Sequence, residues 1–266
     1  MTLVVSMIDL KLALMDLGTK CLRFNIFQRR KSESTQILAK ELATKGSPEG
    51  TTVIVEIQTA GKGRNERLWE SPKGGLWLSL ILTPDICFQL VPMIGLMAGC
   101  AVADVIKLHT GIDAGVKWPN DVEIEGMKVA GILSEANIDS DILTHVILGI
   151  GVNLNFTSTS LPNEVRAIAT TVMDVTGKSV NLNIFTRQLL RRLDELYSIL
   201  TKEDSSKLAI LVRNRLTTLG RSVSITTPNG NVCGIAVDLA DDGALKVRLS
   251  DGSIRLLYSG EVLMVN

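Results

Sequence analysis

A basic, glycine-containing loop is the part of this sequence whose residue types most clearly suggest chemistry. It opens the segment 61–80, GKGRNERLWESPKGGLWLSL, which ends in an apolar run typical of a strand. Glycine lets a backbone approach an anion closely, and Lys and Arg side chains neutralise the anion. An aromatic side chain such as Trp69 can stack on a nucleotide base. We therefore predict a loop that closes over a phosphate-containing ligand; the alternative is a surface loop with scattered basic residues. The small and cationic residues of this loop are Gly61, Lys62, Gly63, Arg64 and Arg67.

A polar corner followed by a hairpin is the second segment of interest. Residues 117–121, Lys-Trp-Pro-Asn-Asp, form a rigid corner, because proline fixes its own φ and restricts the residue before it. A turn is expected at residues 125–126, after which Lys128 precedes the apolar run Val-Ala-Gly-Ile-Leu. A lysine at the start of a strand is usually a solvated edge residue, and the alternative is a cation that binds a ligand. The glycines of residues 149–153, Gly-Ile-Gly-Val-Asn, either admit a ligand or mark a bulge or a tight strand crossing.

Composition narrows the chemistry that these segments can perform. The 28 Lys and Arg residues balance 28 Asp and Glu residues, so no global field draws the protein to nucleic acid or to an anionic membrane. The four cysteines form no C-x-x-C pair, which argues against a zinc ribbon, a thioredoxin motif or a secreted disulfide framework and favours a reducing cytosol. Two histidines, His109 and His145, exclude a His-rich metal site and argue against a His-based triad. We predict chemistry based on Lys, Arg, Asp, Asn and Mg²⁺.

The elements that must position these segments follow from hydrophobic periodicity and turn signals. We expect no secretory signal and no transmembrane helix, because no uncharged apolar run reaches about 18 residues. Helices are predicted at residues 3–17, from a cap within 32–35 to about 45, and at 89–109, 183–200 and 204–217, with a short helical piece near 168–176. Strands are predicted at 21–28, 52–58, 75–82, on both sides of the turn at 125–126, and at 144–152.

The sequence changes character near Gly220. Beyond it, four or five short strand patterns are separated by turn signals at 228–230, 241–243 and 251–252, the spacing of a small β-barrel. We therefore expect an N-terminal appendage at residues 1–18, a catalytic domain at 19–219 and a small domain at 220–266.

The order of these motifs resembles that of the biotin protein ligase family, from about residue 20 to the C-terminus. Lys-Trp-Pro-Asn-Asp followed by Lys-x-Ala-Gly-Ile-Leu is a specific combination, whereas Gly-x-Gly-Arg alone is not. The resemblance implies an α+β fold, with a mixed β-sheet and flanking helices like those of class II aminoacyl-tRNA synthetases and biotin synthetases, and a C-terminal SH3-like β-barrel. The motifs are residues 34–36 (Ser-Thr-Gln), 58–64 (Gln-Thr-Ala-Gly-Lys-Gly-Arg) with Arg67, Trp69 and 71–72 (Ser-Pro), 117–121, 128–133 and 149–153.

The resemblance implies a two-step reaction. Biotin and Mg-ATP give biotinyl-5′-AMP and pyrophosphate, and a lysine of a biotin carboxyl carrier domain then attacks the mixed anhydride. Attack of a carboxylate on the α-phosphorus brings two anions together, so cations and backbone N–H groups suit this site better than a histidine base. Because water would hydrolyse an exposed acyl-adenylate, a closing loop also has a purpose. A cytoplasmic enzyme is expected, and a homodimer is implied by the resemblance alone.

The same resemblance assigns roles to individual residues. Lys128 would hold the biotin carboxylate and the reacting phosphate, Trp69 would stack on adenine, and Asp121 would take a proton from the incoming lysine or orient it. The implied catalytic residues are Lys128, Arg64 and Asp121. The implied biotin-binding residues are Ser34, Thr35, Gln36, Gln58, Lys62, Gly63, Arg64, Lys128 and Gly131. The implied ATP-binding residues are Arg64, Arg67, Trp69, Lys117, Asn120 and Asn153, with Mg²⁺ arriving on ATP and no metal ligand from the protein.

Three positions depart from the family pattern. Gln36 stands where Asn is usual, Lys62 replaces the first Arg of the loop, and Asn65-Glu66 replaces Arg-Gly. Biotin affinity and leakage of the adenylate are therefore open, whereas the reaction class is not. Only 33 residues precede Ser34 and they lack a basic helix-turn-helix pattern, so we expect no DNA-binding domain. A lipoate protein ligase and a non-catalytic binding protein are the two alternatives.

Overall fold

A seven-stranded mixed sheet forms the main body of the computed structural model, which describes residues 7–202, 204–228 and 230–265. The strand order is β1-β2-β3-β7-β6-β5-β4, and only the β1–β2 pair is parallel among these strands. The strands are β1 (Asn25–Ser32), β2 (Thr51–Gln58), β3 (Leu76–Leu82), β4 (Gly115–Lys117), β5 (Asp121–Ile124), β6 (Met127–Asp139) and β7 (Ile142–Val152). The predicted mixed sheet with flanking helices is therefore present.

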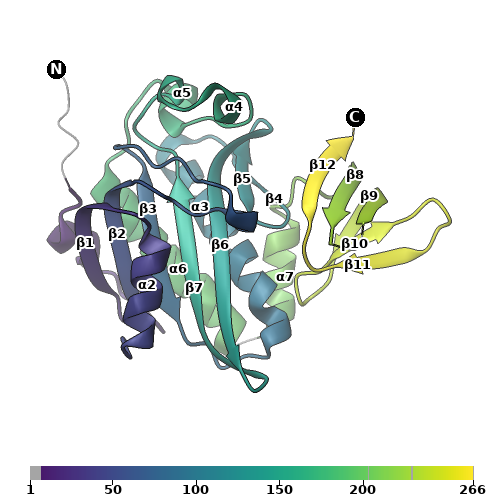
Figure 1. The fold of residues 1–266 in the computed structure, drawn as a ribbon, viewed down its shortest axis with the longest axis horizontal. Helices are drawn as coiled ribbons and strands as arrows, with labels where there is room; N and C mark the ends of the chain where they lie inside the picture. The colour runs from purple at the N-terminus through teal and green to yellow at the C-terminus, as the bar shows by residue number, and fades with distance from the viewer. Residues whose placement is uncertain (1–6, 203, 229, 266) are drawn as a thin grey trace.

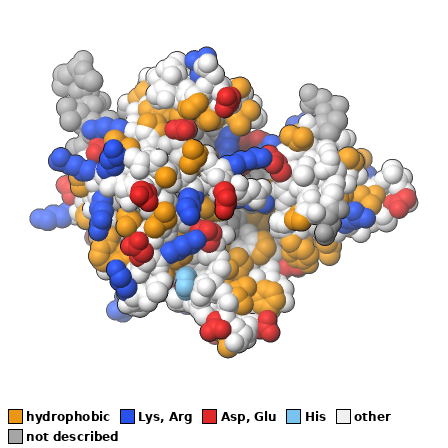
Figure 2. Space-filling view, viewed as in Figure 1, with side chains coloured by type: hydrophobic (Ala, Val, Ile, Leu, Met, Phe, Trp, Pro, Cys, Tyr) orange, Lys and Arg blue, Asp and Glu red, His pale blue; other side chains and the backbone are white. Residues whose placement is uncertain are grey.

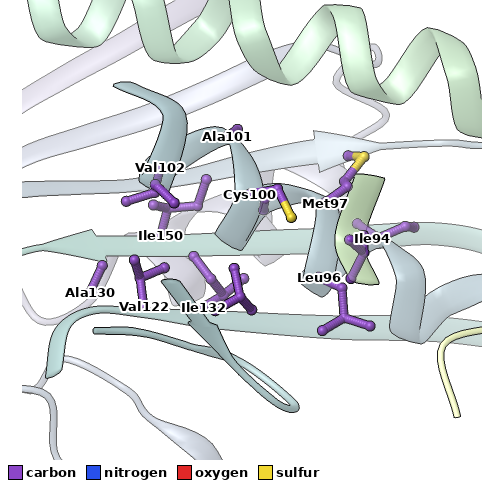
Figure 3. Close-up of a cluster of buried hydrophobic side chains, with 14 of the residues drawn as sticks. Ile94, Leu96, Met97, Cys100, Ala101, Val102, Val122, Ala130, Ile132 and Ile150 are labelled. Carbon is purple, nitrogen blue, oxygen red and sulfur yellow. The ribbon is translucent and has the colours of Figure 1, made fainter. Parts of the chain in front are cut away.

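Helices cover both faces of this sheet (Figure 1). The helix α2 (Thr35–Thr44) lies on one face, and α3 (Val91–Thr110), α6 (Leu182–Lys202) and α7 (Ser205–Arg213) lie on the other. The main core forms where α3 packs on β5, β6 and β7, as Figure 3 shows for Met97 and Cys100 of the helix above Val122 and Ile150 of the strands. Because side chains alternate along a strand, those on the opposite face of β5, β6 and β7 point away from this core.

The N-terminal segment differs from the prediction. Within the described residues, the helix expected at 3–17 is the five-residue α1 (Leu10–Leu14), and the start of the expected helix lies outside the described residues. The strand expected at 21–28 begins only at Asn25. The reason is Asp194 of α6, whose buried carboxylate accepts the backbone N–H groups of Lys20, Cys21 and Leu22 at 2.6–2.9 Å. These N–H groups are therefore occupied before the sheet begins.

The hairpin prediction is confirmed, whereas one helix ends early. Glu125 and Gly126 have φ of 51° and 79°, the left-handed conformations of a tight type I′ turn between β5 and β6. The helix expected at 204–217 ends at Arg213, because the following chain pairs with Val116 of β4 through its N–H and carbonyl groups. The loop after β7 contains two short helices, α4 (Asn163–Arg166) and α5 (Val172–Thr176). Three short 3-10 turns complete the main body: Arg64–Glu66, Phe88–Leu90 and Ser158–Ser160.

The C-terminal part is a five-stranded antiparallel sheet with the order β11-β10-β9-β8-β12. Trp118 joins it to the main body: its backbone N–H donates to Thr218 Oγ1 at 2.9 Å and its indole N–H donates to the Gly243 carbonyl at 3.1 Å. The strand β12 therefore lies beside the polar corner at residues 117–121 (Figure 1). The strands are β8 (Ser222–Thr227), β9 (Gly230–Leu239), β10 (Leu245–Arg248), β11 (Ile254–Leu257) and β12 (Glu261–Val265).

One helical stretch in the described part of the chain is long and apolar enough to cross a membrane by length and composition. It spans Phe88–Thr110, and 72% of its most apolar window is buried inside the protein. This burial is the property of a core helix, which agrees with the position of α3 under the sheet.

Candidate active site

A cavity of about 550 Å³ lies over the face of β5, β6 and β7 that α3 leaves free. Its walls are the start of α2, the loop 61–69, the corner 117–121 and the start of β12. The face in Figure 2 carries Lys and Arg side chains interspersed with Asp and Glu side chains, so positive charge is not spread over the whole surface. Every residue predicted for the site lines this cavity: Ser34, Thr35, Gln36, Gln58, Lys62, Gly63, Arg64, Arg67, Trp69, Lys117, Asn120, Asp121, Lys128, Gly131 and Asn153.

One end of the cavity is a connected set of uncharged polar groups. The Gln58 side-chain oxygen accepts the Thr35 backbone N–H at 2.8 Å, and its amide donates to Ser71 Oγ at 2.7 Å. The hydroxyl of Ser34 caps α2 by accepting the Gln36 N–H at 3.2 Å. Because the network fixes each group, this end suits a neutral ligand with both donors and acceptors, such as a cyclic urea.

Gln36 has a different role from its neighbours. Its amide donates to the carbonyls of Leu133 and Ile147 at 3.3 and 3.1 Å, and its oxygen accepts from Ser79 Oγ at 2.7 Å. A Cβ at Gly149 would lie 2.7 Å from that oxygen, so the glycine is what lets Gln36 lie against β7. Gln36 therefore ties α2 to β6 and β7 beneath the cavity.

The loop at residues 61–69, called the lid below, is a small hairpin. The Gly63 N–H donates to the Arg67 carbonyl at 2.8 Å, and the Trp69 N–H donates to the Gly61 carbonyl at 2.9 Å. At its tip Asn65 and Glu66 adopt φ of 52° and 58°, a left-handed conformation that asparagine tolerates and that costs a residue such as glutamate about 1 kcal/mol or more. The departure from the usual Arg-Gly pair therefore places a glutamate where glycine is unstrained.

Trp69 lies flat against two strands at a point where they have no side chains. A Cβ at Gly131 of β6 would be 2.8 Å from the indole ring, and one at Gly151 of β7 would be 2.5 Å from the indole nitrogen. Lys128 Nζ lies 5.0 Å from the ring centroid, within range of a cation–π contact. The indole N–H is buried and has no hydrogen-bond partner among the described residues. Glycine in these strands therefore makes room for Trp69 and for what binds beside it.

Cations converge on the middle of the cavity. Lys128 Nζ lies 2.7 Å from Asp121 Oδ1 across the hairpin, and Arg64 Nη1 donates to Asn120 Oδ1 at 3.1 Å. Burial lowers the pKa of Arg64, and the nearby Asp121 and Glu261 carboxylates oppose that effect. No ion pair to Lys62 or Lys117 is present in the described part of the chain. Lys62 and Lys117 are therefore available to an anionic ligand.

The two asparagines predicted near the nucleotide support the walls. Asn120 Nδ2 donates to the Ile132 carbonyl at 3.0 Å, and Asn153 Nδ2 donates to the Thr170 carbonyl at 3.0 Å. The first bond fixes the polar corner against β6, and the second fixes the loop after β7. Both asparagines therefore orient cavity walls, and Asn120 also orients Arg64.

Three acidic residues that line the cavity were not predicted: Glu70, Glu123 and Glu261. Glu123 is only 8% exposed, and its strand neighbours Val122 and Ile124 belong to the core, so Glu123 faces the cavity beside Lys128, its partner across the hairpin. The alternation of residues 121–125, Asp-Val-Glu-Ile-Glu, was the signal that could have identified it, because it puts Glu123 on the same face as Asp121. Glu261 follows Gly260 at the start of β12 and pairs with Arg67. It gave no local signal, because its partner is 194 residues away.

The site offers few groups for a metal of its own. Among the described residues no group of three or more His, Cys, Asp or Glu side chains could hold a metal ion. Asp121 and Glu123 supply carboxylate oxygens, which suit Mg²⁺, but Asp121 is already paired with Lys128. This donor set fits a Mg²⁺ ion bound mainly through substrate phosphates.

This chain is similar to known proteins in both sequence and structure. Residues 26–153 match the Biotin/lipoate A/B protein ligase family, and residues 218–265 match the Biotin protein ligase C terminal domain. The chain is 36% identical over 230 residues to the bifunctional ligase/repressor BirA of Bacillus spizizenii, covering 86% of this chain and 70% of that protein. It is 32% identical over 252 residues to the biotin--[acetyl-CoA-carboxylase] ligase of Mycobacterium tuberculosis, covering 92% and 90%. The solved structure of the Aquifex aeolicus biotin protein ligase in complex with biotin and ATP superposes with a TM-score of 0.79 at 29% identity, covering 91% of this chain and 98% of that one.

Proposed function

Since this chain belongs to the biotin protein ligase family, we propose that it activates biotin with ATP as biotinyl-5′-AMP and transfers the biotin to a lysine of a carrier domain. The observation that carries this proposal is the single cavity in which an uncharged polar network, Lys128 and the lid arginines meet. Each of these parts matches one part of the substrates: a urea ring, a carboxylate and phosphates.

Biotin would bind with its ring at the polar end. The hydroxyls of Ser34 and Thr35 and the amide of Gln58 can form hydrogen bonds with the ureido group, because their own hydrogen bonds fix their orientation. The lid would cover the ring and exclude water, and the valeryl chain would run along Gly131 toward Lys128. Gln36 would support this pocket from below rather than contact biotin through a free polar atom.

The first step joins two anions, and the cations of the site oppose their repulsion. Lys128 would hold the biotin carboxylate against the α-phosphate, with Arg64 and Lys117 stabilising charge that develops on the phosphate oxygens. Arg67, which the Glu261 carboxylate already binds, would support the lid instead. Mg²⁺ accompanying ATP would add further charge neutralisation. Trp69 would stack on adenine, with its unpartnered indole N–H directed into the cavity wall. A carboxylate oxygen forms a bond to the α-phosphorus, and the bond from that phosphorus to the bridging oxygen breaks, so the β- and γ-phosphates leave together as pyrophosphate with the bonding electrons.

The second step needs a neutral lysine amine from the acceptor. Asp121 Oδ1 contacts Lys128 at 2.7 Å as an ion pair without making a directed hydrogen bond, so this oxygen keeps capacity for a donor. Asp121 would therefore orient the incoming amine or take its proton, and AMP would leave with the bonding electrons of the anhydride. The acceptor would be the biotin carboxyl carrier domain of a biotin-dependent carboxylase.

We place an appendage at residues 1–18, the catalytic domain at 19–219 and an SH3-like barrel at 220–266; the five-stranded antiparallel sheet supports the last of these. A cytoplasmic location, a homodimer and the absence of operator binding stay predictions. A mobility-shift experiment at physiological salt, in which an operator is retarded, would contradict the last one.

Ligand-dependent pyrophosphate exchange tests the proposed function. Purified protein is incubated with Mg-ATP, labelled pyrophosphate and either biotin or lipoate. Exchange that depends on biotin is the expected result. Exchange that depends on lipoate alone would assign the site to the lipoate branch of the matched family, and exchange with neither ligand would reject the adenylation chemistry.

A further inference from the structure

The C-terminal sheet holds the lid from outside. Arg67 Nη1 and Nη2 donate to the two carboxylate oxygens of Glu261, both at 2.7 Å. Arg64 Nη1 donates to the carbonyl of Gly260 at 3.0 Å. Gly260 and Glu261 are consecutive residues at the start of β12, so one short segment binds two lid arginines. The lid and the C-terminal sheet are thus connected at the mouth of the cavity.

The lid has little to hold it closed by itself. None of the residues in its 3-10 turn is buried, and Leu68 is 72% exposed. At its tip Glu66 is in the left-handed region, which is unfavourable for glutamate. A segment with so few buried apolar contacts opens at small free-energy cost. Contacts with its surroundings therefore decide how much of the time it is closed.

The Arg67–Glu261 pair has the geometry to keep the lid closed. A bidentate arginine–carboxylate contact fixes orientation as well as distance. Hydrogen bonding to Arg67 lowers the pKa of Glu261, and the same bond raises the pKa of Arg67, so both groups are charged at neutral pH. The side chains are 66% and 46% exposed, so the pair contributes little to global stability. A small contribution is sufficient for a local equilibrium that is itself close to balance.

We propose that Glu261 is a positioning residue, which holds the lid closed through Arg67 and thereby sets how long the acyl-adenylate is retained. This inference rests on the proposed function. The C-terminal sheet is then part of the closing device, because Gly260 and Glu261 together hold the two arginines. The competing possibility is that Glu261 withholds Arg67 from the ATP phosphates, and it predicts opposite kinetics.

The first test needs no ligand and no activity. Hydrogen exchange of the Gly63 and Trp69 amides reports opening of the lid, since both N–H groups donate within the hairpin. We expect exchange of both amides to be roughly two- to fivefold faster in Glu261→Gln, the range that an exposed ion pair supports. Asp113→Asn is the matched control, because it removes an exposed ion pair with Lys107 that lies away from the cavity lining. Equal exchange in Glu261→Gln and in the unmodified protein would overturn the proposal.

The second test follows the adenylate. Biotinyl-AMP formed in the site is chased with unlabelled biotin and ATP, and its release is measured. We expect release from Glu261→Gln to be faster by the factor seen in exchange, with kcat for pyrophosphate exchange changed less than about twofold. The charge swap Arg67→Glu with Glu261→Arg should return release toward the unmodified rate, whereas Glu261→Arg alone should show the largest increase.

The outcomes distinguish a failure of the proposed role of Glu261 from a failure of the proposed function. If the unmodified protein makes no adenylate, the proposed function fails, while the exchange experiment still decides whether Glu261 holds the lid. If adenylate forms and Glu261→Gln releases it at the rate of the unmodified protein, the proposed role of Glu261 is rejected. A lower KM for ATP in Glu261→Gln without faster release would also reject it, in favour of withholding of Arg67. The conservative Gln variant keeps the conclusion accessible even if the charge swap does not fold.

Discussion

Lys128 and Asp121 form an ion pair across the hairpin of β5 and β6, with Nζ 2.7 Å from Oδ1. Both side chains are about a quarter exposed, so the pair is neither buried nor fully solvated. An anion that enters the cavity competes with Asp121 for Lys128. When the anion binds Lys128, Asp121 is free to accept a hydrogen bond from another donor. The ion pair thus connects the two proposed steps, because the ligand binds Lys128 in the first step and Asp121 is then free for the incoming amine in the second.

Replacement of Lys128 by Ala should abolish adenylation. Loss of a single group that stabilises developing charge typically lowers kcat by about 10²–10³-fold. We expect biotin-dependent pyrophosphate exchange to fall by at least that factor, while the thermal unfolding midpoint changes little, because the ion pair is partly exposed. Lys128→Arg is the control that keeps the charge and should retain part of the activity. Full exchange by the Ala variant would remove Lys128 from the mechanism.

A methyl group at Gly151 should displace Trp69. The added Cβ would lie 2.5 Å from the indole nitrogen, which is closer than nonbonded atoms approach. We expect a KM for ATP raised about tenfold and a shift of the Trp69 fluorescence maximum, since overpacking of this kind costs about 1–3 kcal/mol. Combining Gly151→Ala with Trp69→Leu should relieve the overlap, which a recovered unfolding midpoint would show. An unchanged fluorescence maximum in the single variant would contradict the packing.

Glycine at position 66 should tighten the lid. Glu66 has φ of 58°, and glycine occupies this conformation without the strain of about 1 kcal/mol. We expect Glu66→Gly to slow exchange of the Gly63 and Trp69 amides by about threefold. Asn65→Gly is the matched control: its φ is 52°, but asparagine tolerates the left-handed region, so little strain is relieved. Faster exchange in Glu66→Gly would show that chain entropy outweighs the strain.

Truncation of Gln36 should destabilise the fold rather than only the ligand complex. Gln36→Ala removes the amide that donates to the carbonyls of Leu133 and Ile147, whereas the Ser79 hydroxyl keeps Thr35 Oγ1 as an acceptor. Each buried group left unpaired costs about 1–3 kcal/mol, so we expect the free energy of unfolding to fall by about 2–4 kcal/mol. Urea unfolding without ligand measures it. A change below 1 kcal/mol would show that water replaces these bonds.

Acid should open the lid before it unfolds the protein. The Arg67 hydrogen bond lowers the pKa of Glu261 below its ordinary value of 4.5. A carboxyl group with a lowered folded pKa contributes stability above its unfolded pKa and loses it as the pH falls through the folded pKa. We therefore expect lid protection to be constant from pH 7 to about 5 and to decline below pH 4.5, the ordinary pKa of Glu261. Exchange rates corrected for intrinsic pH dependence measure this, with Glu261→Gln showing no such decline.

Local patterns in the sequence were sufficient for the elements that build the site. The helix cap within residues 32–35, the strand that ends at Gln58 and the turn at residues 125–126 depend on neighbouring residues alone. The structure contains all three, with Ser34 as the cap. The motif residues also line one cavity, because each motif lies at an end or on the free face of such an element. Their roles in binding and catalysis stay predictions.

Contacts between distant residues account for what was missed. The first strand starts late because of Asp194, more than 170 residues further along the chain, and α7 ends early because of pairing with Val116. Neither interaction leaves a periodic signal at the residues that it changes. Glu261 escaped notice for the same reason, whereas Glu123 could have been identified from the alternation that puts it on the same face as Asp121.

Asp194 also determines how much of the N-terminus can be removed. Its carboxylate is 1% exposed and is satisfied by three consecutive backbone N–H groups, those of Lys20, Cys21 and Leu22. A chain shortened to begin before Lys20 keeps these donors, so the carboxylate stays paired. A chain that begins after Leu22 would leave a charge inside the protein with no donor, at a cost comparable to the whole stability of many domains. The donors of Asp194 therefore set the innermost limit for shortening the chain, while Ile8 and Ala13 before them also pack in the core.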